Sequence, residues 1–108
     1  MDHSANTTPF LQSLKAEHRA LAILRMLNRE PSYRSNERII GAWLEHLALG
    51  GLADEIRQQL DDLARFGVIR LEKVEGLLLA TLTEMGSDVA NGRRVIDGVL
   101  RPFPDEHY

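Results

Sequence analysis

The chain has 108 residues, a formal net charge of −3, 44% hydrophobic residues and no cysteine. This length and composition suit one globular domain that is stable without disulfides, and they exclude a thiolate metal site. The longest apolar run, residues 74–82, is far shorter than the roughly 18 residues that a membrane-spanning helix needs. The N-terminus lacks the basic and apolar segments of a signal peptide, so we expect a cytoplasmic protein with no membrane partner.

A first helix is expected after a disordered N-terminus at residues 1–8. Thr8 is suited to act as its N-cap, and Pro9 suits the first helical position because the missing N–H would have no helical partner there. Apolar residues then recur at helical spacing as far as Asn28. Pro31 predicts that the helix has ended, because the residue before a proline avoids the helical region.

Two further helices are expected before any strand. The second should begin near Ser35 or Asn36, either of which can cap it, and should end at the pair Gly50 and Gly51. The third should span residues 54–66, with an apolar stripe on one face and a glycine directly after it.

The hydrophobic period changes in the last third of the chain. Residues 68–73 and 77–82 predict two strands joined by a tight turn, and residues 83–92 predict a short capped helix. The expected fold is therefore mainly α with a small β-hairpin, an α+β class, in the order helix, helix, helix, strand, strand, helix. That order is typical of a winged helix-turn-helix domain, here at residues 9–92, followed by an extended tail at residues 93–108.

Two stretches of the chain carry a resemblance to known proteins. Residues 60–69, LDDLARFGVI, and residues 82–92, LTEMGSDVANG, resemble parts of bacterial winged-helix transcriptional regulators. Over residues 10–104 the chain is similar to a family of small winged-helix proteins of Mu-like phages and prophages. The matching runs begin at His18, Glu75, Asp88 and Arg101. The resemblance implies a regulator-like role by fold alone, since that family has no settled activity.

Double-stranded DNA is the first partner that this fold suggests. In a DNA-binding winged helix the third helix enters the major groove, where Arg recognises guanine and Gln recognises adenine. Basic residues at the start of the second helix, in the hairpin and after the last helix are candidates for phosphate contacts. The candidate DNA-binding residues are Arg34, Arg38, Arg57, Gln58, Gln59, Arg65, Arg70, Lys73, Arg93 and Arg94.

The third helix also argues for a different partner. Asp61 and Asp62 would face or flank phosphates and oppose the charge attraction on which DNA affinity depends. The alternative is a protein-interaction module on the same scaffold that binds a phage or host protein. A continuous basic stripe through Arg34, Arg38, Arg57 and Arg93 would favour DNA, whereas a third-helix face dominated by Asp61 and Asp62 would favour a protein partner.

No catalytic or metal-binding pattern is found. No histidine pair has helical ligand spacing, and no phosphate loop or nucleophile motif is present, so we expect neither enzyme activity nor a cofactor. Apolar residues near the two ends of the chain are candidates for a homodimer or partner contact. These residues are Phe10, Leu14, Leu100 and Phe103.

Overall fold

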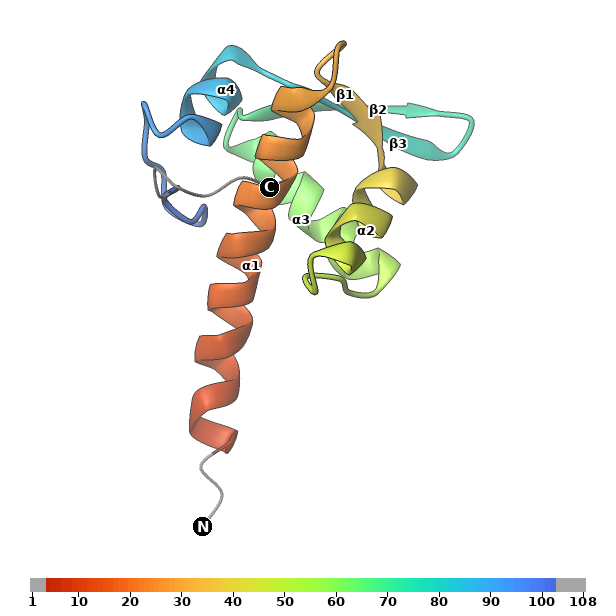
Figure 1. Ribbon diagram of the computed structural model, residues 1–108. Helices are drawn as coiled ribbons and strands as arrows, with labels where there is room; N and C mark the ends of the chain where they lie inside the picture. The colour runs from red at the N-terminus through yellow and green to blue at the C-terminus, as the bar shows by residue number, and fades with distance from the viewer. Residues whose placement is uncertain (1–3, 103–108) are drawn as a thin grey trace.

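The computed structural model describes residues 4–102, with the backbone alone described for residues 4–8. It is an α+β domain, the expected class, in which helices pack beneath a small sheet while α1 extends away from the body (Figure 1). In chain order the elements are α1 (Ser4–Arg29), β1 (Arg34–Asn36), α2 (Glu37–His46), α3 (Ala53–Arg65), β2 (Ile69–Val74), β3 (Leu77–Leu82) and α4 (Glu84–Ala90).

The sheet has three antiparallel strands in the order β1-β3-β2. The expected hairpin is present as β2 and β3, but the expected element order was wrong because it lacked β1. Arg34 pairs with Thr81, and the carbonyl of Tyr33 accepts a hydrogen bond from Leu82 N at 2.8 Å. Tyr33 has φ 58, which turns the chain from α1 into the strand. A three-residue strand is too short to show an alternating pattern, so the sequence gives no sign of it.

The ends of the first two helices differ from expectation. Helix α1 begins at Ser4, so Thr8 is not its N-cap and Pro9 lies inside it as the sixth residue. The φ of proline suits a helix, but Pro9 cannot donate the usual hydrogen bond to the carbonyl of Ala5. Asn36 caps α2 as expected, accepting from Arg38 N at 3.0 Å and Ile39 N at 2.9 Å. Helix α2 ends before the glycine pair.

The end of α2 is formed by Ala48, which takes the left-handed conformation expected of a glycine, with φ 61. Two backbone hydrogen bonds close the turn, from Leu49 N to Leu44 O at 2.7 Å and from Ala48 N to Glu45 O at 3.0 Å. Burial of Leu49, which is 6% exposed, offsets the cost of the left-handed alanine. By contrast, the expected end of α3 is confirmed, since Gly67 follows its cap with φ 81.

One hydrophobic core joins the four helices with strands β2 and β3, and the C-terminal half of α1 lies at its centre (Figure 1). The largest fully buried side chains are Leu21, Ile23, Leu24, Leu27, Ile40, Leu44, Leu60, Leu63, Ile69, Val68 and Val89. The C-terminal segment joins this core instead of standing free. Val99 is buried, Leu100 packs against the core, and Leu100 N donates to the carbonyl of Glu17 at 3.0 Å. Leu100 therefore contacts its own domain, and Phe103 lies outside the described residues.

Candidate interface at the α2–α3 pair and the hairpin

Helix α3 is held in place by contacts with α1. The buried Arg19 of α1 donates from Nε to Leu49 O at 2.8 Å and from Nη2 to Gly50 O at 3.2 Å, which fixes the loop that leads into α3. Gln59 donates from Nε2 to the carbonyl of Ala16 at 3.2 Å. Gln59, a candidate base reader, thus turns toward α1 instead of away from the domain.

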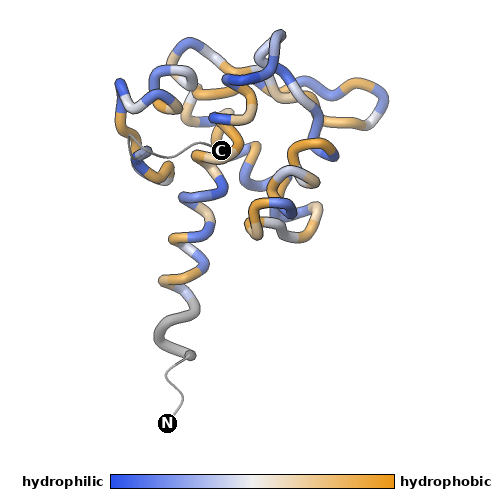
Figure 2. Tube along the Cα trace, in the orientation of Figure 1, coloured by the Kyte–Doolittle hydropathy of each residue, from blue (hydrophilic) through white to orange (hydrophobic). Residues whose placement is uncertain are grey.

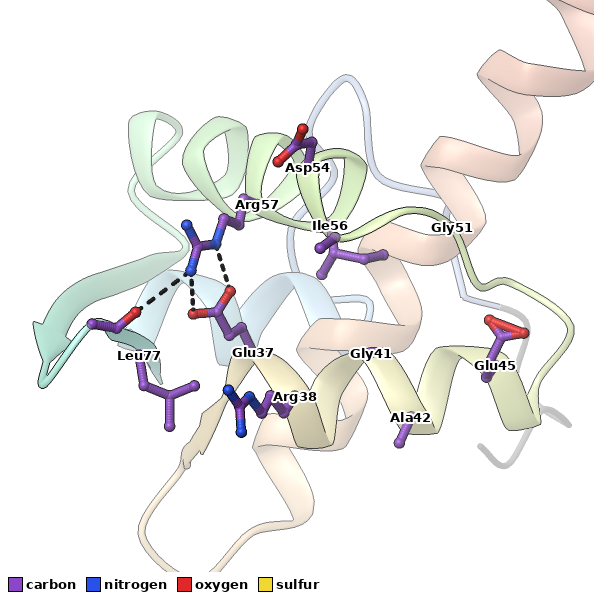
Figure 3. A pocket seen from close by; sticks show the side chains of 12 residues that line it. Glu37, Arg38, Gly41, Ala42, Glu45, Gly51, Asp54, Ile56, Arg57 and Leu77 are labelled. Atoms are coloured by element: carbon purple, nitrogen blue, oxygen red, sulfur yellow. Dashed lines mark hydrogen bonds and ion pairs between the residues drawn. The ribbon is translucent and has the colours of Figure 1, made fainter.

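An ion pair connects α2, α3 and the hairpin (Figure 3). Arg57 Nε lies 2.6 Å from Glu37 Oε1, and Arg57 Nη2 donates to Glu37 Oε2 at 3.0 Å. The same carboxylate accepts a hydrogen bond from Leu78 N at 2.7 Å, and its side chain is only 9% exposed. The Arg57 hydrogen bond lowers the pKa of Glu37, and in return the carboxylate raises the pKa of Arg57. The candidate base reader Arg57 is therefore paired with a carboxylate of α2 in this structure.

Three more of the candidate cations make ion pairs with the protein's own carboxylates. Arg34 Nη2 lies 2.6 Å from Glu72 Oε1, and Arg93 Nε lies 3.0 Å from Asp88 Oδ1. The remaining pair joins Arg65 to Asp62, which also accepts a hydrogen bond from Gln58. Such exposed pairs stabilise the fold little, but each one offsets a positive charge that a phosphate would need.

Four candidate cations make no ion pair within residues 9–102. These are Arg38, Arg70, Lys73 and Arg94, and all are exposed. They do not form one surface. Arg70 and Lys73 are three residues apart in β2, so their side chains point to opposite faces of the sheet. Of the four arginines whose continuous basic stripe would favour DNA, three are paired with carboxylates, namely Arg34, Arg57 and Arg93.

The solvent-facing side of α3 is acidic. Asp54, Gln58, Asp61 and Arg65 follow one another at helical spacing, and all four are exposed. Arg65, the basic residue of this stripe, is paired with Asp62. An anionic partner would therefore meet two unpaired carboxylates on this side of the helix, while a cationic partner would be attracted to it.

A groove of about 550 Å³ lies between α2, the first turn of α3 and the hairpin turn. Figure 3 shows Glu37 and Arg57 at one end of it and Glu45 at the other, with Gly41 between them on α2. Sequence reasoning missed Glu37, Gly41 and Glu45 as site residues. Glu37 resembles an ordinary first-turn carboxylate, and no sequence spacing indicates its pairing with a residue of another helix.

Two negative findings apply to the part of the chain that the structure describes. No group of three or more histidine, aspartate or glutamate side chains is placed to hold a metal ion among these residues. Within the same residues, none of the helices combines the length and the apolar character needed to cross a membrane.

The geometry defines a small α+β domain whose helix pair and hairpin present one exposed face of mixed charge. The protein is similar to "Uncharacterized protein gp26" of Escherichia phage Mu, with 35% identity over 94 residues, which cover 87% of this chain and 97% of that protein. The chain therefore belongs to the gp26 family of Mu-like phages. No family model matches the chain, and no solved structure matches it.

Proposed function

We propose that this protein is a protein-interaction module of a Mu-like phage, built on a winged-helix scaffold, without catalytic activity of its own. The observation that supports this most is the charge of the α3 face. Both arginines of α3, Arg57 and Arg65, are paired with carboxylates, while Asp54 and Asp61 remain exposed and unpaired within the described residues. The partner that fits is a phage or host protein with a basic surface.

The order of the elements supports the winged-helix assignment. Helices α2 and α3 lie in the place of a helix-turn-helix pair, and the β2–β3 hairpin lies in the place of a wing. In the sheet order β1-β3-β2, strand β3 pairs with β1. The hairpin therefore lies beside the start of α2, which directly follows β1. Membership of a Mu-like phage family supports a role in the phage, without indicating which one.

A photo-crosslinking experiment tests the protein-partner proposal. A benzoylphenylalanine in place of Gln58, in cells that produce the phage, is expected to give one discrete adduct, since Gln58 is central on the acidic stripe of α3. The same group at Glu84, which is exposed on α4, is the control and should give none. Asp61→Lys should remove the Gln58 adduct. Equal adducts at both positions, or none at either, would contradict the proposal.

DNA binding is the second candidate, favoured by a separate observation. Arg38 lies at the start of α2, and Arg70 and Lys73 lie in the hairpin, which are backbone-contact positions in a DNA-bound winged helix, and all three are exposed. This candidate predicts that mixed-sequence duplex DNA binds with an affinity that falls steeply with salt and falls again on Arg38→Ala, measured by fluorescence anisotropy. Absence of binding at low salt would exclude it.

We also propose that α1 contacts a second copy of the chain. Residues 9–15 are all exposed, and Phe10 and Leu14 are 66% and 43% exposed on the part of α1 that extends from the body. Figure 2 shows hydrophobic positions continuing along this part of the helix. Leu14 lies one heptad before the buried Leu21, on nearly the same side of the helix, so the apolar stripe continues past the domain.

The α1 contact predicts a change in oligomeric state. The double change Phe10→Glu with Leu14→Glu should convert a dimer into a monomer, because two carboxylates would replace the apolar stripe. Size-exclusion chromatography with light scattering measures the mass directly. Gln12→Glu, on another side of the same exposed segment, should leave the mass unchanged. A wild-type protein that is monomeric at tens of micromolar would refute the contact.

A further inference from the structure

The floor of the groove between α2 and α3 contains a glycine that the fold does not require. Gly41 lies in the interior of α2 and lines the groove. A Cβ at this position would meet no atom within 4 Å, and the backbone of Gly41 has no positive φ. Alanine would therefore favour the helix, since glycine inside a helix costs about 0.5–1 kcal/mol relative to alanine. What Gly41 does provide is a backbone that another molecule can approach closely.

The charges around the groove select the chemistry of that molecule. Glu37 and Arg57 neutralise one another at the hairpin end. Glu45 and Asp54 also line the groove, and neither makes an ion pair within the described residues, whereas Arg38 is the one cation among the lining residues that is left unpaired there. The balance is negative, which favours a cationic occupant.

The N-terminus of α3 also disfavours an anionic ligand in the groove. Helix N-termini attract anions through their free N–H groups, but here the carboxylate of Glu55 already accepts a hydrogen bond from Leu52 N at 2.9 Å. Asp54 stands in the same first turn. A phosphate or carboxylate in the groove would meet the carboxylate of Asp54, which lines it, so an anionic ligand is disfavoured.

We propose that the groove accepts a basic segment of a partner protein, with its backbone over Gly41 and its arginine or lysine side chains directed to Glu45 and Asp54. The volume of about 550 Å³ is large enough for a short peptide stretch with such side chains. Guanidinium groups bind carboxylates through paired hydrogen bonds, which makes arginine the better fit. This proposal rests on the proposed function and adds the chemistry and location of the partner contact.

The test uses synthetic peptides as probes. A series of labelled Gly-Ser peptides carries two arginines at spacings of one to five residues, and a matched series carries citrulline, which has the same shape without the charge. Fluorescence anisotropy with the full chain should show binding of at least one arginine peptide and of no citrulline peptide. Shifts of the Gly41 and Ala42 amide resonances should locate the bound peptide in the groove.

Four variants test whether the peptide binds in the groove. Gly41→Leu should fold normally, because a Cβ at this position meets no atom within 4 Å, and should weaken binding at least tenfold by filling the groove. Glu45→Gln and Asp54→Asn should each weaken binding by about tenfold, as expected for a charged hydrogen bond. Glu84→Gln, at an exposed carboxylate of α4 that does not line the groove, is the control and should bind as the wild type does.

The peptide-binding results either support or overturn the proposed site in the groove. Weaker binding by Gly41→Leu, Glu45→Gln and Asp54→Asn, with no effect of Glu84→Gln, supports the groove. Equal binding to the wild type and to Gly41→Leu, or no arginine peptide binding at any spacing, overturns it. In either of those cases the photo-adduct at Gln58 still tests the proposed function independently, so the two failures are distinguishable.

Discussion

Gly86→Ala is expected to lower the free energy of unfolding by about 2–3 kcal/mol, a large part of the stability of a small domain. Gly86 is buried in α4, where a Cβ would overlap the carbonyl oxygen of Val68 and lie 2.6 Å from Leu82 Cδ1. A backbone oxygen cannot move aside as a flexible side chain can. Helix α4 would therefore have to shift away from the sheet and open the core around Val89. Urea denaturation followed by circular dichroism measures the change.

Glu84→Ala is the matched control for this prediction. Glu84 is exposed in the first turn of the same helix, so its removal should change the stability by less than about 1 kcal/mol. A Gly86→Ala protein as stable as the wild type would show that α4 does not pack closely against Val68 in solution.

Gly86 also explains one of the stretches that carried the family resemblance. In the run from Leu82 to Gly86, the hydroxyl of Thr83 accepts a hydrogen bond from Gly86 N at 3.0 Å and donates to Gly67 O at 2.7 Å. Thr83 thus caps α4 and links it to the end of α3, while Gly86 permits the close approach. This stretch therefore serves to join the last helix to the sheet. That structural role does not indicate whether the protein binds DNA.

The elements that the sequence predicted well are those whose determinants are local. The apolar stripe of α3, the cap at Asn36 and the tight turn between β2 and β3 each depend on residues within a few positions of one another. Strand β1 depends instead on pairing with β3, some 45 positions later, as in the Arg34–Thr81 pair. No local pattern indicates such a pairing.

The candidate site was less predictable than the fold, for the same physical reason. A sequence shows which charged residues a helix carries, but it does not show which residues of other elements form ion pairs with them. Arg57 has the right type and position for a base reader, yet its partner Glu37 lies on the preceding helix, and Gln59 is turned toward a carbonyl of α1. The acidic character of α3 was visible in Asp61 and Asp62, and it is the feature on which the proposed protein partner now depends.

The Glu37–Arg57 pair predicts a dependence of stability on pH. The folded protein lowers the pKa of Glu37 below its ordinary value of 4.5, chiefly through the Arg57 hydrogen bond. A carboxylate with a lowered pKa contributes stability that is fully present above the pKa of the unfolded chain and is lost as the pH falls through the folded pKa. The wild-type free energy of unfolding should therefore decrease below about pH 4.5, and part of that decrease should be absent in Glu37→Gln.

At pH 7, Glu37→Gln should also lower the free energy of unfolding by about 1–3 kcal/mol, because an amide replaces the carboxylate that holds both Arg57 and Leu78 N. Urea denaturation at pH 3 to 7 measures both effects. The control is Glu72→Gln, whose ion pair with Arg34 is well exposed and should contribute less than about 1 kcal/mol at any pH. If Glu37→Gln and Glu72→Gln proteins lose stability equally, the buried carboxylate does not connect α2, α3 and the hairpin. The groove would then lack the fixed end against which a partner is proposed to bind.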